Sequence, residues 1–161
     1  MANFELKICD LHNAFALGFT WADRVISLVD PDCISKPNFS SKVPHLILTF
    51  DDIIRPREGE VCPTKEQIES ILEFTADIKE GEKVLIHCHG GVSRSTAVAV
   101  IVLVQHGDSP GQALARVLQL RKQAWPNELI IKFGDELLEK NGALIKFIEL
   151  WMESNAGKII T

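Results

Sequence analysis

The sequence has no apolar stretch long enough to cross a membrane. A spanning helix needs about 20 mostly apolar residues, and the longest uninterrupted apolar run, residues 97–104, has eight. The first residues include Glu5, Lys7 and Asp10 and lack the basic start and apolar segment of a signal peptide. We therefore expect no membrane insertion.

Positive charge and closely spaced cysteines are also scarce. The chain has 17 Lys and Arg against 22 Asp and Glu, a formal net charge of −5. A general nucleic-acid-binding protein normally presents a basic patch, so we expect no binding to nucleic acid. The four cysteines (Cys9, Cys33, Cys62 and Cys88) are widely separated and form no CxxC pair. Such spacing favours free thiols in a reducing compartment, so we predict a cytoplasmic protein. Because no His/Cys cluster has metal-ligand spacing, neither a metal nor a cofactor is expected.

The chain has 161 residues, of which 46% are hydrophobic, and this length corresponds to one domain. Continuous apolar runs predict strands over residues 6–9, 25–29, 45–50 and 83–87. Runs without alternation are typical of strands that are buried on both faces of a parallel sheet.

Helical periodicity alternates with these runs. A helix is predicted over 64–80, because Thr64 and Gln67 have the spacing of a capping box. A second is expected to begin just after Arg94 and continue to about residue 105. Pro110 and Pro126 each favour the first turn of a further helix, and residues 144–152 predict the last one. The fold class is therefore α/β, with a central, mostly parallel twisted sheet of four to five strands flanked by helices.

The most informative segment is His87-Cys88-His89-Gly90-Gly91-Val92-Ser93-Arg94-Ser95, which lies between a predicted strand and a predicted helix. The two glycines permit backbone conformations that other residues rarely adopt. A loop of this length can direct several backbone N–H groups inward, and at a helix N-terminus such a loop binds anions. Arg94 can add two parallel hydrogen bonds to phosphate oxygens. The segment therefore indicates a phosphate-binding loop.

The N–H groups of the loop, the helix N-terminus and Arg94 together create a positive field, and such a field also stabilises a thiolate at Cys88. A thiolate that faces a bound phosphate indicates phosphoryl transfer through a phosphocysteine intermediate, and the leaving oxygen then needs a proton donor. Asp51 and Asp52 follow the strand predicted over 45–50. Because parallel strands end at one edge of a sheet, either carboxyl group can open onto the cleft that contains Cys88.

The segment HCHGGVSRS resembles the Cys-x5-Arg signature of the protein tyrosine phosphatase superfamily, and the small dual-specificity-phosphatase-like branch fits best. This resemblance implies one catalytic domain over residues 1–161. It also implies the site residues: Cys88 as nucleophile, Arg94 as phosphate clamp, Ser95 as hydrogen-bond partner of the sulfur, His87 as the residue that orients Cys88, Asp52 as general acid with Asp51 as the alternative, and a phosphate-binding loop of His89, Gly90, Gly91, Val92, Ser93 and Arg94.

The resemblance further implies hydrolysis of phosphotyrosine, with phosphoserine and phosphothreonine left open. The substrate is then a phosphorylated protein or a small phosphate ester, and the loop binds phosphate, sulfate or vanadate. Two features depart from the large tyrosine-specific enzymes: the only Trp-Pro pair, Trp125-Pro126, follows the loop, and the chain has no tyrosine. Alternatives are a phosphoinositide or small phosphate-ester phosphatase with the same mechanism, a sulfur transferase of the rhodanese type, and a non-catalytic phosphate-binding module.

The remaining candidates are predicted to have structural roles. Cys9, Cys33 and Cys62 are expected in the core, and one of them could act as a resolving thiol for an oxidised Cys88. Arg116 and Arg121 are expected to be solvated. Residues 36–44 and 53–63 are predicted loops, and nothing in the sequence argues against a monomer.

Overall fold

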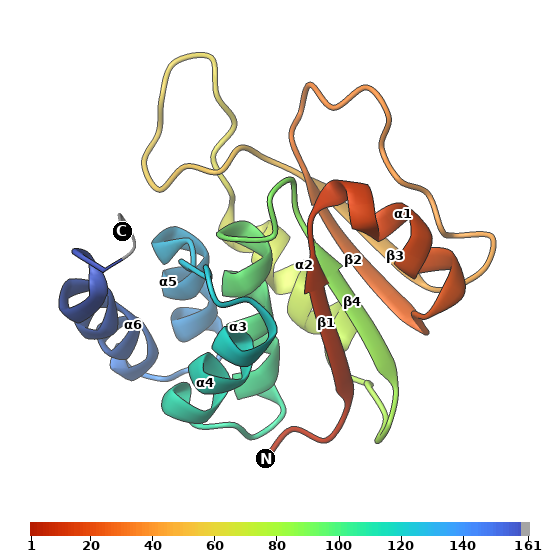
Figure 1. Cartoon of the computed structure of the whole chain (residues 1–161). Coiled ribbons are helices and arrows are strands. Elements are labelled where there is room, and N and C mark those ends of the chain that lie inside the picture. Colours follow the sequence, from red (N-terminus) through yellow and green to blue (C-terminus); the bar gives the residue numbers. More distant parts are fainter. Residues whose placement is uncertain (159–161) are drawn as a thin grey trace.

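The computed structural model describes residues 1–158, which form a parallel four-stranded sheet packed between helices (Figure 1). The strand order is β1-β4-β2-β3. The strands are β1 (Glu5–Cys9), β2 (Arg24–Val29), β3 (His45–Thr49) and β4 (Lys83–His87). The predicted α/β class and parallel sheet are confirmed.

Helices cover both faces of the sheet unequally (Figure 1). One face carries α1 (Leu11–Thr20), which packs with part of the 30–44 loop over a small core. The larger core lies on the other face, against the remaining helices: α2 (Lys65–Thr75), α3 (Arg94–Gln105), α4 (Pro110–Leu120), α5 (Glu128–Leu137) and α6 (Ala143–Asn155).

Helix α3 is the centre of the larger core, because every residue from Arg94 to Val104 is buried. Its neighbour α5 approaches closely at Gly134, where an added Cβ would lie 2.3 Å from Cγ2 of Ile101. A helix that is apolar all round must be buried on all sides. This burial fixes the N-terminus of α3 relative to the end of β4.

The carboxyl ends of all four strands meet at one edge of the sheet. Cys9 lies opposite His87 in the β1–β4 register, Ser27 lies opposite His87 between β2 and β4, and Val29 lies opposite Thr49. In open α/β sheets, ligands bind outside this edge. The segments that leave the four strands therefore determine the site.

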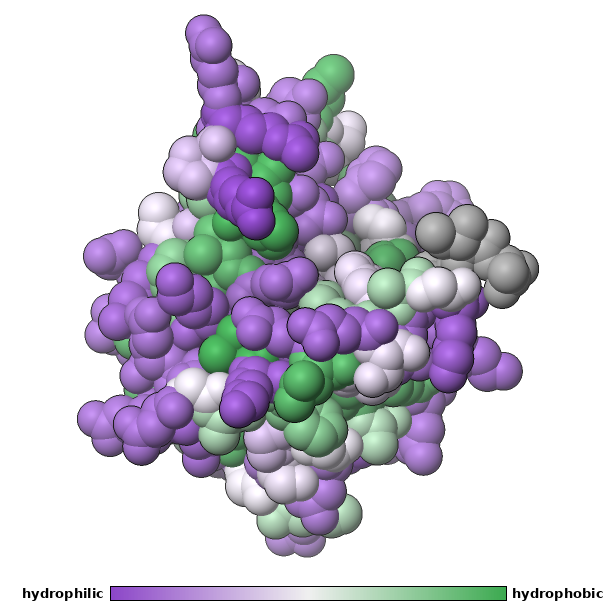
Figure 2. Space-filling model, turned by 90° about the vertical axis from the view of Figure 1, so that its left-hand side faces the viewer, coloured by the Kyte–Doolittle hydropathy of each residue, from purple (hydrophilic) through white to green (hydrophobic). Residues whose placement is uncertain are grey.

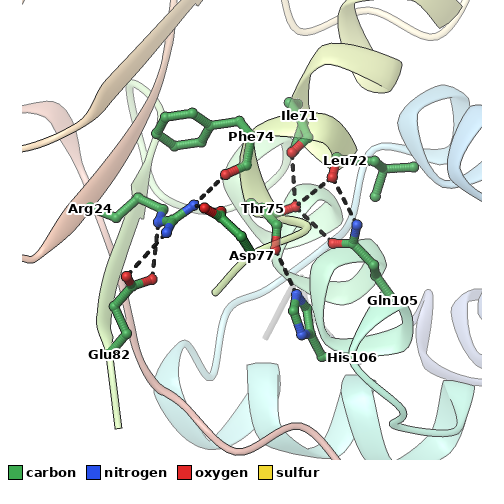
Figure 3. Close-up of polar contacts among 9 residues, drawn as sticks. All are labelled: Arg24, Ile71, Leu72, Phe74, Thr75, Asp77, Glu82, Gln105 and His106. Carbon is green, nitrogen blue, oxygen red and sulfur yellow. Dashed lines mark hydrogen bonds and ion pairs between the residues drawn. The ribbon is translucent and has the colours of Figure 1, made fainter. Parts of the chain in front are cut away.

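A polar network holds the opposite end of the sheet (Figure 3). Arg24, which is buried at the start of β2, forms ion pairs with Asp77 at 2.8 Å and Glu82 at 3.0 Å, and it also donates to the carbonyl of Phe74. Arg24 lowers the pKa of Asp77 by hydrogen bonding and charge. The hydroxyl of Thr75 donates to Oε1 of Gln105 at 2.7 Å, which joins α2 to α3. These contacts anchor the scaffold well away from the other edge.

Most of the predicted elements are confirmed, one helix was not predicted, and three expectations need correction. Residues 11–20 form α1, for which the sequence analysis made no prediction. Helix α2 ends at Thr75 rather than at residue 80. Helix α5 begins at Glu128 with Asn127 as its N-cap, so Pro126 precedes it. Strand β3 is only half-buried, because it is an edge strand.

Figure 2 shows the side of the molecule that is at the left of Figure 1, where α6 and the loop between β3 and α2 lie. Apolar areas on this side are separated by hydrophilic side chains. Within residues 1–158, no helix is both long and apolar enough to span a membrane.

Candidate active site

Cys88 directly follows β4 at the carboxyl edge of the sheet and is 3% exposed. Its sulfur lies 3.2 Å from the hydroxyl of Ser95, and the backbone N–H of Gly91 donates to the same sulfur at 3.2 Å. Hydrogen bonds donated to a sulfur favour its charged form. The site therefore offers two donors to a thiolate at this position.

The carbonyl groups of residues 88–93 all point away from the inside of the loop. Each accepts a hydrogen bond from outside the loop, at 2.9 to 3.3 Å. The donors, in the order of the carbonyls, are His87 Nδ1, Leu11 N–H, Arg121 Nη2, Arg121 Nε, Trp125 N–H and Asn127 N–H. With the carbonyls held outward, the N–H groups of His89, Gly90, Val92 and Ser93 are free to face a central anion, as in a nest, while that of Gly91 donates to the Cys88 sulfur.

Gly91 is required by this loop geometry. Its φ is +68°, and a Cβ at this position would lie 2.8 Å from the carbonyl carbon of Cys9. Gly90 has no positive φ, and the nearest atom to an added Cβ is Val92 Cγ2 at 3.9 Å. Of the two glycines, only Gly91 needs the conformational freedom that the sequence analysis assigned to both.

The guanidinium of Arg94 is buried beneath the loop. Its Nη1 pairs with Oδ1 of Asp30 at 2.8 Å and donates to the carbonyl of Phe50 at 2.8 Å. Its Nε is buried and has no hydrogen-bond partner among the described residues. A buried N–H without a partner costs free energy, and a phosphate oxygen in the loop would remove that cost.

Asp51 and Asp52 face different groups. The Asp51 carboxylate accepts from the N–H of Val61 at 2.7 Å, which closes the base of the loop before α2. Oδ1 of Asp52 accepts from the hydroxyl of Ser93 at 2.8 Å and from Nδ2 of Asn127 at 3.0 Å. Of the two, only Asp52 contacts the 88–93 loop, so the hydrogen-bond partners distinguish the two adjacent carboxylates.

His87 is wholly buried beneath the loop. Its Nε2 lies 2.6 Å from the hydroxyl of Ser27, which is also wholly buried, and its Nδ1 faces the carbonyl of Cys88 at 3.3 Å. Burial lowers the pKa of His87 to about 4. The imidazole is therefore neutral at physiological pH.

A cavity of about 210 Å³ opens beside the loop. Its wall combines apolar side chains with polar ones, namely Leu11, Val29, Asp30, Asp32, Cys33 and His89. Asp30 is paired with Arg94, whereas the exposed Asp32 makes no ion pair or side-chain hydrogen bond with any described residue. A second hollow on the other side of the loop includes Asp52, Ser93 and Trp125.

The other three cysteines, Cys9, Cys33 and Cys62, lie in different parts of the fold. Cys9 is buried in the core beneath α1, whereas Cys88 belongs to the core on the opposite face of the sheet. Burial, together with the nearby Asp10, raises the pKa of Cys9 to about 12. Cys33 and Cys62 are half-buried rather than in the core as expected, because both lie in loops outside the strands and helices.

The prediction for the two arginines is also wrong. Arg121 binds the carbonyls of Gly90 and Gly91, and Arg116 is half-buried against Asp108 at 3.2 Å. Sequence reasoning also missed Asp30 and Asn127. Asp30 directly follows β2, so the argument that selected Asp51 and Asp52 would have found it. Asn127 gives no signal beyond that of a helix cap.

The comparisons with known proteins agree with this geometry. The family described as Cyclin-dependent kinase inhibitor 3 (CDKN3) matches residues 46–114, which include β4 and the 88–93 loop. No curated protein matches the chain. Many solved structures do.

Three solved structures illustrate the similarity. The structure described as Tk-PTP in the active form has a TM-score of 0.63 and 26% identity, and the alignment covers 87% of this chain and 94% of that one. Human DUSP28 has a TM-score of 0.62 at 21% identity, with coverage of 84% and 94%. PTPMT1 in complex with PI(5)P has a TM-score of 0.57 at 18% identity, with coverage of 85% and 94%. The last two likenesses concern the fold.

Proposed function

We propose that the chain is a cysteine-dependent phosphomonoesterase of the Cys-x5-Arg protein tyrosine phosphatase superfamily, in its dual-specificity-phosphatase-like branch, and the family match and the 26% identical Tk-PTP structure support this assignment. Its substrate is phosphotyrosine in phosphorylated proteins, with phosphoserine and phosphothreonine left open. The observation that carries the proposal is the loop itself: its carbonyls are bonded outward, Ser95 and the Gly91 N–H contact the Cys88 sulfur, and the buried Nε of Arg94 has no partner among the described residues.

In the first step, the substrate phosphate binds to the N–H groups of residues 89–93 and to Arg94. The Cys88 thiolate attacks phosphorus, the S–P bond forms and the P–O bond to the leaving group breaks. Asp52, in its protonated form, gives its proton to the leaving oxygen. The contacts with Ser93 and Asn127 hold this carboxyl group beside the loop.

In the second step, water attacks the phosphocysteine. Asp52, now a carboxylate, accepts a proton from the water, the S–P bond breaks and inorganic phosphate forms. The electron pair returns to the sulfur as a thiolate. The hydroxyl of Ser95 and the N–H of Gly91, each 3.2 Å from the sulfur, stabilise that leaving thiolate. Asp30 keeps the Arg94 side chain in place throughout.

The cavity beside the loop supports a protein substrate. Asp32 adds an unpaired negative charge where the group that carries the phosphate would lie, and Leu11 and Val29 add apolar surface. A polyanionic inositol ring would be repelled there. A phosphoinositide is the second candidate, since the neighbour PTPMT1 was solved with PI(5)P, and loss of the Asp32 charge would favour it.

The proposal covers residues 1–161 as one catalytic domain that acts as a monomer in the cytoplasm. The test is phosphate release from p-nitrophenyl phosphate in the presence of EDTA, by the wild type and by Cys88→Ser. Turnover that survives EDTA and is abolished in the variant supports the proposal. A wild type that binds vanadate without turnover would instead support a phosphate-binding module. Phosphopeptides and PI(5)P, compared in the wild type and in Asp32→Asn, then distinguish the two substrate classes.

A further inference from the structure

The buried His87, the buried Ser27 and the half-buried His45 form a line that crosses three strands of the sheet and ends at the backbone of Cys88. His45 lies on β3, Ser27 on β2 and His87 on β4. The hydroxyl of Ser27 lies 2.7 Å from Nε2 of His45 and 2.6 Å from Nε2 of His87. Neither His45 nor Ser27 is part of the mechanism described above.

The outer end of the line fixes the tautomer of His45. The backbone N–H of Phe39 donates to Nδ1 of His45 at 3.1 Å, so Nδ1 must carry a lone pair. Burial lowers the pKa of His45 to about 4, and a neutral imidazole with a free Nδ1 carries its proton on Nε2. His45 therefore donates to the oxygen of Ser27.

The donor and acceptor of each following hydrogen bond are then determined in turn. Because Ser27 accepts from His45, its single hydroxyl proton is free for Nε2 of His87. His87 then keeps its own proton on Nδ1, which faces the carbonyl oxygen of Cys88 at 3.3 Å. The opposite tautomer would place two lone pairs against each other at that point. All four contacts are satisfied by only one arrangement of protons.

We infer that His45 and Ser27 are positioning residues for Cys88: through this directed line they hold His87 in the Nδ1–H tautomer, which fixes the Cys88 carbonyl and so the start of the 88–93 loop. The outer end of the line is itself rigid. Phe39 is wholly buried and its ring packs against Phe19 and His45, at centroid distances of 4.8 and 5.0 Å. Three charged or titratable side chains influence the pKa of His87: His45 and Arg94 lower it and Asp10 raises it.

The inference rests on the proposed function for its effect on catalysis, but its geometry can be tested without turnover. Long-range ¹H–¹⁵N NMR spectra of the wild type at neutral pH report which ring nitrogen of each histidine carries the proton. The inference predicts Nδ1–H for His87 and Nε2–H for His45. A protonated Nε2 on His87 would overturn it, whatever the enzyme activity.

The catalytic effect is tested by cutting the line. Ser27→Ala is expected to reduce kcat/KM for p-nitrophenyl phosphate about tenfold, and to move the midpoint of iodoacetamide inactivation of Cys88 to higher pH. Thr75→Ala is the matched control, because Thr75 is an equally buried hydroxyl that binds Gln105 at the far end of the sheet. If both variants lose stability equally and neither shifts the inactivation midpoint, the line is only structural and the inference fails.

A second pair of variants covers the case in which Ser27→Ala does not fold. His45→Gln keeps a side-chain N–H that can reach the Ser27 oxygen, whereas His45→Leu does not. Gln is expected to retain most of the wild-type inactivation midpoint and Leu to lose it. Equal midpoints in the two variants contradict the inference. Since inactivation and NMR need no phosphate turnover, an inactive wild type with the predicted tautomers would refute the proposed function and leave this inference standing.

Discussion

Arg121 holds Gly91 by a hydrogen bond from its Nε to the Gly91 carbonyl at 3.0 Å, while its Nη2 binds the carbonyl of Gly90 at 3.0 Å. One guanidinium thus secures two consecutive peptide groups of the 88–93 loop from a residue 30 positions along the chain. Both carbonyls are turned away from the anion position by this fork, which makes Arg121 part of the loop's support.

Loss of this fork should weaken the loop. Arg121→Met keeps the aliphatic stem and removes both donors, each of which is charge-assisted and contributes about 1.5–3 kcal/mol. We expect kcat/KM to fall at least about tenfold and vanadate to bind more weakly. Lys122→Met removes one positive charge from the neighbouring exposed position and should change neither quantity. Equal effects of the two variants would mean that only the charge matters.

The two loop glycines should differ in their tolerance of alanine. Gly91→Ala places a Cβ 2.8 Å from the Cys9 backbone at a φ of +68°, and a left-handed conformation costs about 1–2 kcal/mol for an L-residue. Thermal unfolding should show a lower Tm, and activity should be lost. Gly90→Ala has room and should leave Tm almost unchanged. A tolerated Gly91→Ala would contradict the loop geometry.

Substitutions of the two adjacent aspartates should also differ in their effect on catalysis. Asp52→Asn removes the proton donor, so kcat for p-nitrophenyl phosphate should fall by about 10²–10⁴ and the decline in rate at high pH should disappear. Asp51→Asn retains an oxygen that can accept from the Val61 N–H, and its pH profile should match that of the wild type. Profiles of the opposite kind would assign the acid to Asp51.

Stability should fall as the pH falls from about 6.5 to about 4. The pKa values of His45 and His87 are lowered from 6.5 to about 4, so in this window the unfolded chain binds protons that the folded chain does not. Each histidine then contributes up to about 1.4 kcal/mol per pH unit to the decline in the free energy of unfolding. Urea unfolding at about pH 7 and pH 5 measures the decline, and His45→Gln should reduce its slope. A flat profile would show that both imidazoles are solvated.

Much of this fold was predictable because its elements carry local signals. The Thr64–Gln67 capping box is present as predicted, and the apolar run of α3 is buried as its composition requires. Helix α1 carried no comparable signal, because it buries small residues: an added Cβ on Gly18 would lie 2.5 Å from the Phe39 ring. Its packing depends on a residue from a distant loop.

The candidate site likewise combines residues that a local sequence signal predicts with residues that only the packed fold brings together. Cys88, Gly90, Gly91 and Arg94 all lie within residues 87–95, so one short segment of sequence predicted them together. Asp30, Arg121 and Asn127 reach the loop from other elements, and their contacts exist only once the sheet and helices are packed. The line from His45 through Ser27 to His87 depends on the register of three strands, which a single sequence does not specify.

The most direct test of the central claim is to look for the phosphocysteine. Ser95→Ala removes the hydroxyl that lies 3.2 Å from the Cys88 sulfur, so the second step should slow more than the first and the intermediate should accumulate. The measurement is an acid quench soon after mixing with p-nitrophenyl phosphate, followed by mass spectrometry of the peptide that contains Cys88. The account predicts one phosphoryl group on Cys88. Turnover with Cys88 unmodified at every time point, or with the phosphoryl group on another residue, would contradict it.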